Sequence, residues 1–93
     1  MHLTPGQLEE LTILAGLFFS VNDIIIALDI DPELHARFSY IISCENENPI
    51  YRAYHTGRLT EEIKLREAIK LAAMNGSNPA QNTLINYFNN SKP

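Results

Sequence analysis

Apolar residues recur three and four positions apart along most of the chain, which is the spacing of amphipathic helices, and the pattern predicts no strands. The first helix begins at Pro5, because Thr4 is a good N-cap and proline is well tolerated at the first helical position. Gly16 is a natural stop for this helix. Its apolar face consists of Leu8, Leu11, Leu14 and Ala15.

A second helix begins after Ser20, with Asp23 three residues later in an acidic variant of the capping box. Its body contains three consecutive isoleucines, Ile24 to Ile26, which could also form a buried strand. The cap before them and the next cap a few residues after them favour a helix.

The stretch from Asp29 to Pro32 predicts a tight turn into a third helix. Asp29 tolerates the left-handed conformation better than a branched residue does, and Ile30 is expected to point into the core. Asp31 is a good cap and Pro32 a good first helical residue. The third helix is predicted to end near Ile42 and to bury Leu34, Phe38 and Ile41 or Ile42, before a polar loop over residues 43–47.

A fourth helix opens with the same device, Asn48 followed by Pro49. Its first apolar face is Ile50, Ala53, Tyr54 and Gly57, and the face resumes with Leu65, Ala68, Ile69 and Ala72. Either one long helix bends near Gly57 or two helices meet there with Thr60 as a cap. We favour one helix, because a single glycine is all that interrupts it. Leu59, Ile63 and Leu71 lie off the main face, so this helix needs more than one partner surface.

The last helix is expected to start at Asn78-Pro79, after Asn75-Gly76-Ser77 ends the fourth. Its face is Ala80, Thr83, Leu84, Tyr87 and Phe88, and residues 89–93 are expected to fray. The sequence thus predicts an all-α protein of five helices in a single domain, residues 1–93. Its helix-turn-helix core covers about residues 5–43, and the long helix and C-terminal hairpin cover about residues 48–89.

Composition narrows the class of protein. Hydrophobic residues make up 45% of the chain and charged residues 19%, which excludes a disordered chain. No apolar run is long enough for a membrane span, and no signal peptide is visible. A single cysteine, Cys44, fits a reducing compartment, and we expect the cytoplasm of a bacterial host cell.

Charge is unevenly distributed along the chain. Residues 1–48 carry one basic residue against eight acidic ones, a net charge of −7, whereas residues 49–93 carry six against three, a net charge of +3. Such asymmetry often marks the face that meets a polyanion or a charged partner, although the two halves could equally neutralise each other.

No pattern in the chain predicts an enzyme, a cofactor or a metal site. The four glycines are isolated, so no phosphate-binding loop is present in the sequence. His2, His35 and His55 are scattered without metal-ligand spacing. Cys44 has no activating partner and is expected in a loop or half-buried, and Glu61-Glu62 is interpreted as a solvated helix start.

Helix two, the turn and helix three have the spacing of a homeodomain-like helix-turn-helix. Residues 26–31 resemble the usual A-x-x-L-G-V-S turn, with Ile25 in place of the alanine and Asp29 in place of the glycine. The plausible DNA contacts are His35, Arg37, Ser39 and Tyr40 on the third helix, and Arg52 and Arg58 on the fourth.

The negative charges near the start of the third helix argue against sequence-specific DNA binding. Asp29, Asp31 and Glu33 would each cost affinity near phosphates. In an isolated subunit Arg37 is expected to pair with Glu33, one turn earlier, and Arg66 can pair with Glu62.

The order of the segments resembles the phage terminase small subunits, the small helix-turn-helix DNA-packaging proteins. The resemblance covers about residues 14–88. Residues 48–58 (NPIYRAYHTGR) are similar to the family's D-P-x-Y-x-A-Y-x-x-G-K/R stretch, residues 65–72 (LREAIKLA) to its following helix, and residues 76–81 (GSNPAQ) to its G-S-x-P-A-Q turn.

The resemblance implies a non-enzymatic DNA-packaging protein. Such subunits recognise double-stranded viral DNA, assemble as homo-oligomeric rings and hand the DNA to a terminase large subunit, which has the ATPase and the nuclease. Two alternatives stay open: a dimeric helix-turn-helix transcriptional regulator that reads a palindromic site, or a protein-interaction module that no longer binds DNA and binds a basic partner through residues 1–48.

Overall fold

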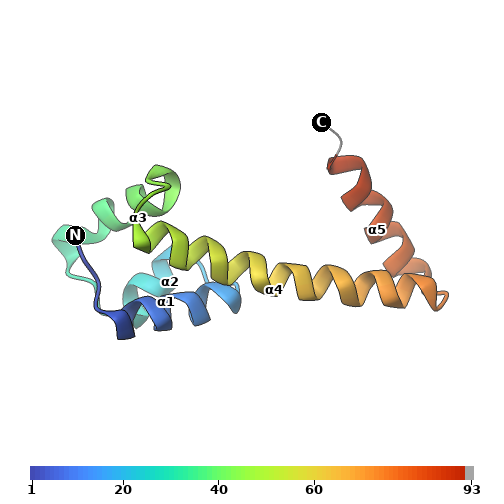
Figure 1. Ribbon diagram of the computed structural model, residues 1–93, viewed down its shortest axis with the longest axis horizontal. Coiled ribbons are helices and arrows are strands. Elements are labelled where there is room, and N and C mark those ends of the chain that lie inside the picture. Colours follow the sequence, from blue (N-terminus) through green and yellow to red (C-terminus); the bar gives the residue numbers. More distant parts are fainter. Residues whose placement is uncertain (92–93) are drawn as a thin grey trace. The chain divides into compact units, whose positions relative to one another are not determined.

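The computed structural model describes residues 1–91, and all regular structure in this range is helical. Five α-helices follow one another along the chain (Figure 1), which confirms the predicted all-α class. They are α1 (Pro5–Gly16), α2 (Val21–Ala27), α3 (His35–Cys44), α4 (Pro49–Met74) and α5 (Asn78–Asn90), and a 3-10 turn, η1 (Pro32–Leu34), precedes α3. The fraying expected at residues 89–93 is not seen at Asn89 and Asn90, which are helical, and residues 92 and 93 lie outside the described range.

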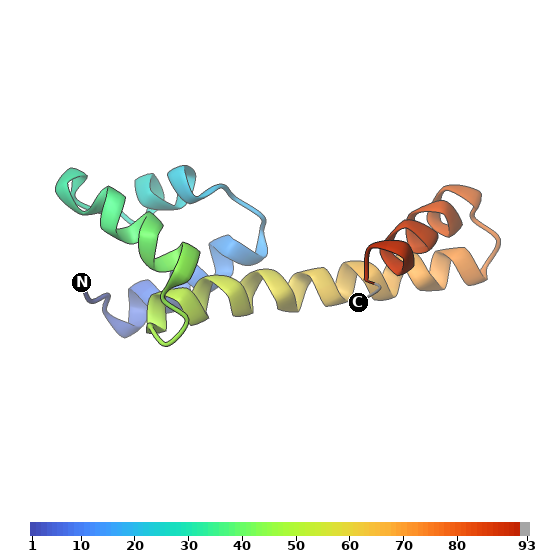
Figure 2. The same cartoon turned by 90° about the horizontal axis from the view of Figure 1, so that it is seen from above.

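The chain forms two compact units, and the boundary between them falls inside α4. The N-terminal unit, residues 1–61, contains α1, α2, α3 and the first part of α4. The C-terminal unit begins at Glu62 and contains the rest of α4 and α5, which folds back after the turn that ends α4 (Figure 2). The domain predicted from sequence is therefore built from two parts.

Two of the predicted helix starts are fixed by side-chain caps. The Thr4 hydroxyl accepts a hydrogen bond from the Gln7 amide at 3.1 Å, and the Gln7 side chain accepts one from the Thr4 amide at 2.9 Å. The Ser20 hydroxyl accepts from the Asp23 amide at 3.1 Å. These bonds satisfy amides that the helix itself leaves without partners, so both predicted caps are confirmed.

The core of the N-terminal unit is formed by the faces that the sequence predicted. Phe38, Leu11, Ile24, Ile41 and Ile50 are its largest fully buried side chains. Ile42 is buried as well, so both isoleucines at the end of α3 enter the core. On the α4 face Tyr54 is buried and Ala53 packs against the core.

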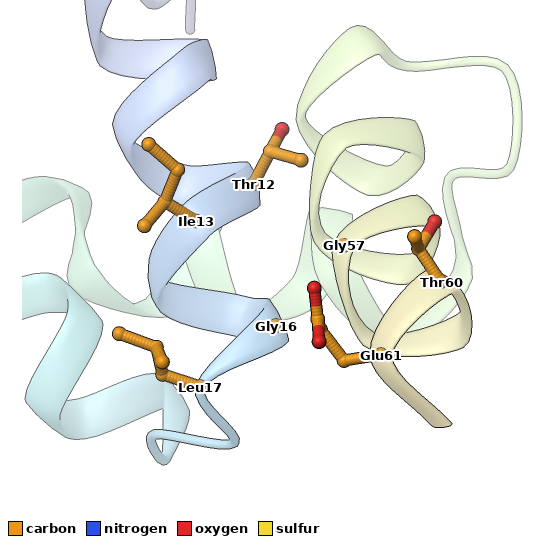
Figure 3. Close-up of a pocket in the computed structure, with 7 residues that line it drawn as sticks. All are labelled: Thr12, Ile13, Gly16, Leu17, Gly57, Thr60 and Glu61. Carbon is orange, nitrogen blue, oxygen red and sulfur yellow. The ribbon is translucent and has the colours of Figure 1, made fainter. Parts of the chain in front are cut away.

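Gly16 and Gly57 mark a close approach of α1 and α4. A Cβ atom added to Gly16 would lie 3.1 Å from the carbonyl oxygen of Gly57 and 2.9 Å from Cγ of Glu61. Figure 3 shows the Glu61 side chain between the two helices, beside Gly16. The helix α4 continues through Gly57 as one element, which confirms the preferred single long helix.

The residue that turns the chain after α1 is Phe18 rather than Gly16. Gly16 is the predicted stop of this helix, and α1 does end there. The left-handed conformation, however, is adopted by Phe18, at φ 64°. Gly16 is needed for packing, because its missing side chain lets α4 approach.

The turn between α2 and α3 has the predicted conformation at its centre. Asp29 adopts the left-handed conformation at φ 53°, and Ile30 is 7% exposed in the core. Both predictions are confirmed. The Asp29 backbone thus takes the shape that a glycine would take in the usual helix-turn-helix sequence.

The start of the third helix differs from the prediction. The Asp31 side chain makes no capping hydrogen bond, and residues 32–34 form η1 before α3 begins at His35. The Leu34 amide instead donates to the main-chain carbonyl of Asp31 at 2.8 Å. In such a 3-10 turn an i→i+3 bond satisfies the free amide, so a side-chain cap is unnecessary. At its other end α3 continues to Cys44, two residues beyond the predicted end at Ile42.

The fourth helix begins as predicted, with the Asn48 side chain accepting a hydrogen bond from the Ile50 amide at 3.0 Å. After α4, Gly76 makes the turn at φ 95°. The helix α5 starts at Asn78, as predicted, and its N-cap is Ser77, whose hydroxyl accepts a hydrogen bond from the Ala80 amide at 3.4 Å. The Gln81 side chain then donates to the carbonyl of Ala73 at 3.0 Å.

The C-terminal unit has almost no core within its described residues, where Ala73 alone is buried. Leu65, expected to continue the buried face of α4, is 47% exposed, and Phe88, expected on the packed face of α5, is 64% exposed. These two predictions were wrong, because two helices in a hairpin can each cover only one side of the other.

Candidate nucleic-acid interface

The candidate DNA contacts of α3 lie on two sides of the helix. His35 and Ser39 are four residues apart and share one side, and Arg37 and Tyr40, three apart, share another. Arg37 is two positions after His35, which corresponds to a rotation of about 200° around an α-helix. The structure therefore does not bring the four together on one surface.

His35 is the first residue of α3, directly after the turn η1. Its ring is half-buried, and Nε2 lies 2.8 Å from the carbonyl oxygen of Ile30. Because a carbonyl only accepts, Nε2 must carry the proton and donate it. This hydrogen bond ties the helix start to the turn. Ser39, on the same side, accepts a bond at its carbonyl from the Ser43 hydroxyl at 2.9 Å.

Arg37 pairs with Glu45, and not with Glu33 as the sequence predicted. The guanidinium binds both carboxylate oxygens of Glu45. Nη1 donates a hydrogen bond to Oε2, and Nη2 donates one to Oε1 at 3.1 Å. Glu33 lies in η1, outside α3, so the regular one-turn spacing to Arg37 does not hold. Glu45, which follows the last residue of α3, takes its place. The ion pair has the bidentate geometry that arginine favours with carboxylates.

Tyr40 is exposed beside this ion pair, with the Arg37 guanidinium 5.8 Å from its ring centroid. A side-chain hydrogen bond with Cys44 and the negative charge of the Cys44 thiolate raise the pKa of Tyr40 above its usual 10.0. Cys44 is the last residue of α3 and is exposed, with Sγ 3.4 Å from the Tyr40 carbonyl oxygen. The thiol is therefore neither in a loop nor half-buried, as the sequence analysis had expected.

Arg52 is the most open of the candidate arginines. Its Nη2 lies 3.6 Å from Glu47 Oε2, and the two side chains are 67% and 95% exposed. A surface pair of this kind contributes little to stability and opens easily. Arg52 is thus accessible to a phosphate, but it stands on α4, away from the α3 contacts in sequence.

Arg58 is a packing residue of the N-terminal unit. Its Nη2 donates to the carbonyl of Phe19 at 3.3 Å, and its guanidinium lies 5.2 Å from the Tyr54 ring centroid and 5.8 Å from that of Phe18. Its Nε is buried and makes no hydrogen bond to any described residue. Arg58 therefore holds the α1–α2 loop against α4.

The surface charge of the N-terminal unit is strongly acidic. Residues 1–61 contain three arginines against nine acidic residues, a net charge of −6. Residues 62–91 contain three basic residues against two acidic ones, a net charge of +1. There Arg66 pairs with Glu62 at 2.8 Å, as predicted, and lies 4.0 Å from the ring centroid of Tyr87. The candidate contacts thus do not gather into a basic patch.

The exposed apolar residues of the α1–α2 loop were not predicted from the sequence. Leu17, Phe18 and Phe19 are 63%, 46% and 44% exposed, and Phe18 has a positive φ. The available signal was two adjacent aromatic residues between a helix stop and the Ser20 cap, where turn residues are normally polar.

Residues 1–91 contain neither a metal-binding cluster nor a membrane-spanning helix. No three side chains of His, Cys, Asp or Glu lie close enough together to hold a metal ion. No helix in this range is long and apolar enough to cross a membrane. Comparison of the chain with protein-family models, curated proteins and solved structures gave no significant match in any of the three.

Proposed function

We propose that the protein is a non-catalytic DNA-packaging subunit of the small-terminase kind. It acts as a homo-oligomer, contacts double-stranded DNA through α3 and the start of α4, and supports a large ATPase and nuclease subunit. The helix-turn-helix segment, with Asp29 in the left-handed conformation and Ile30 buried, supports this assignment. So do the motifs of residues 48–58 and 76–81.

The observation that carries the proposal is the exposed apolar surface of the C-terminal unit. Its large exposed side chains, from 47% to 74% accessible, are Ile63, Leu65, Leu71, Met74, Ile85 and Phe88. A short helical hairpin in which Ala73 alone of the residues up to Ser91 is buried has too little core to be stable alone. Association of several copies through this unit would remove the apolar surface from water, and its net charge of +1 opposes association only weakly.

Assembly would also compensate for the low affinity of a single subunit for DNA. One Arg37, paired with Glu45, makes a weak site. Several copies on one duplex act together, because each contact after the first forms within the same complex. The proposed subunit therefore binds DNA only as an oligomer.

The first test is the solution mass of the full chain, measured by light scattering over a concentration series. We expect a discrete multimer, and we expect the double variant Ile85→Lys with Phe88→Lys to be a monomer. Ile26→Lys is the matched control, because Ile26 is an equally apolar side chain, 76% exposed, in the N-terminal unit. This control should assemble as the unchanged chain does.

DNA binding is measured on the same samples with duplex DNA over a range of salt concentrations. Affinity should fall steadily as salt rises, because phosphate contacts release counterions. The monomeric double variant should lose binding together with assembly. A chain that is monomeric and has no affinity for duplex DNA at low salt would contradict the proposal.

A protein-interaction role is the second candidate, and the pairing of the arginines favours it. Arg37, Arg52 and Arg58 each contact a partner within the N-terminal unit. Under this alternative the chain assembles but has no DNA affinity at any salt concentration. Its complexes with protein partners would then survive nuclease treatment unchanged.

A further inference from the structure

An apolar hollow opens between α1 and α2 in the N-terminal unit. Its volume is about 300 Å³, and it is lined by Leu14, Phe19, Asp23, Ile24 and Ala27. Ile24 is fully buried, whereas Phe19 is 44% exposed. Asp23 is the one charged residue in this lining.

Hydrogen bonds tie the loop that carries Phe19 to α1 and α4. The Phe19 amide donates to the Leu14 carbonyl at 3.4 Å, and the Phe19 carbonyl accepts from Arg58. The neighbouring Phe18 adopts φ 64°, which is unfavourable for a bulky residue, and its amide donates to Ala15 at 3.0 Å. Backbone strain of this kind is retained where the surrounding structure enforces it, often at binding sites. The Phe19 ring is thus pre-positioned beside the hollow.

The charge around the hollow indicates what binds there. Asp23 makes no ion pair with any described residue, and the N-terminal unit carries a net charge of −6. A carboxylate beside an apolar hollow repels DNA and favours a segment that brings both apolar side chains and a cation. A second N-terminal unit, with the same negative charge, would be repelled.

We propose that this hollow binds a basic amphipathic helix of a protein partner. An apolar side chain of that helix enters between Leu14, Phe19 and Ala27, and a lysine or arginine one turn away pairs with Asp23. Helices commonly dock in this way, through apolar residues at three- and four-residue spacing in a groove. The inference does not depend on assembly or on DNA binding, so it can fail while the proposed function stands.

The probe is a fluorescein-labelled synthetic peptide of about 18 residues, with leucines at helical spacing on one face and lysines elsewhere. Two matched peptides replace either every lysine by glutamate or every leucine by serine. Binding to the full-length chain is measured by fluorescence anisotropy. We expect the leucine–lysine peptide to bind and the two matched peptides to bind at least about tenfold more weakly, a difference of about 1.4 kcal/mol.

Two pairs of variants locate the site. Phe19→Ser and Asp23→Asn should each weaken binding of the leucine–lysine peptide by about tenfold. Their controls are Ile26→Ser, which also removes an exposed apolar side chain, and Asp31→Asn, which removes the same charge outside the hollow. Both controls should bind as the unchanged chain does, and circular dichroism checks that all four variants stay folded.

Several results would overturn the proposal. If Asp23→Asn and Asp31→Asn weaken binding equally, the peptide responds to the net charge of the protein and not to the hollow. If the serine–lysine peptide binds as well as the leucine–lysine peptide, apolar side chains do not contribute to binding. Competition by duplex DNA would identify a nucleic-acid surface instead. Loss of oligomer mass in Phe19→Ser would show that a second copy of the chain occupies the hollow. Failure of all peptides to bind, with assembly and DNA binding intact, would overturn this inference alone.

Discussion

Gly57 of α4 lies against the main-chain carbonyl of Thr12 in α1 with room for a hydrogen atom and nothing larger. A Cβ atom added to Gly57 would overlap that carbonyl oxygen, and it would lie 3.0 Å from the carbonyl carbon and 3.2 Å from Cα of Thr12. Since all three are backbone atoms, no rotamer change can relieve the contact. The two helices meet here backbone to backbone.

Gly57→Ala should therefore destabilise the N-terminal unit. Overpacking against backbone costs about 1–3 kcal/mol, more than the gain of about 1 kcal/mol in helix propensity. The measurement is the urea midpoint of unfolding. Gly6→Ala in α1 is the control, because its nearest neighbour would be 4.0 Å away, at Thr4 Oγ1, and it should be neutral or slightly stabilising. Equal midpoints for the two variants would show that the helices separate freely at Gly57.

The carboxylate of Glu45 occupies the guanidinium of Arg37. Glu45→Gln should raise the affinity for duplex DNA at low salt, because it removes the carboxylate that holds the guanidinium. Glu33→Gln changes the net charge equally but removes no partner of Arg37, so it separates pairing from overall charge. We expect a larger gain from Glu45→Gln in anisotropy titrations. Equal gains would mean that the ion pair is irrelevant to binding.

The ion pair itself should contribute little to folding. The Arg37 and Glu45 side chains are 45% and 27% exposed, so solvent screens their attraction. Arg37→Gln is expected to cost at most about 1 kcal/mol of unfolding free energy, while lowering DNA affinity. A loss of stability as large as that of a core substitution would contradict this expectation.

Asp29 occupies a backbone conformation that suits glycine. Asp29→Gly should be neutral or stabilising, and Asp29→Val should cost about 1–2 kcal/mol, because a branched side chain clashes in the left-handed region. Asp29→Asn controls for the lost charge, since asparagine tolerates this region as well. Thermal unfolding distinguishes the three variants. A valine variant as stable as the asparagine variant would mean that the turn adopts another conformation.

The cap of α5 distinguishes two neighbouring residues. Ser77→Ala should weaken the start of this helix by about 1 kcal/mol, because it removes the hydroxyl that accepts from the Ala80 amide. Asn78→Ala, one residue further along, should have little effect. Amide hydrogen exchange over residues 80–84 reports the difference. The reverse order of effects would show that the Asn78 side chain caps the helix instead of Ser77.

Much of the helical layout was predictable, because it depends on neighbouring residues. Thr4, Ser20 and Asn48 cap their own helices with side chains only two or three residues away from the amides they satisfy. The left-handed turn at Asp29 and the buried Ile30 follow from the same local constraints. The predicted cap at Asp31 was wrong because two hydrogen bonds can satisfy the same amide. The Leu34 amide donates to the main-chain carbonyl of Asp31 and not to its side chain.

The candidate DNA interface was much less predictable. The sequence indicated six polar or basic side chains, but whether each is available depends on partners that only folding brings near. Arg58 meets the Phe19 carbonyl 39 residues earlier in the chain, and Arg37 meets Glu45 eight residues later. A basic side chain pairs with the carboxylate that lies nearest in space. Helical spacing predicts this partner only when both residues belong to the same helix, and Glu33 lies before the start of α3.

The all-helical class, the helix order and most of the caps can be predicted from the amino-acid sequence, since they arise from backbone hydrogen bonding and apolar periodicity within a few residues. The packing roles of Gly16 and Gly57, the turn at Phe18 and the exposed apolar faces of the C-terminal unit become visible in the folded chain alone. The physical reason is that burial and close packing depend on which surfaces meet, and residues far apart in the chain supply those surfaces.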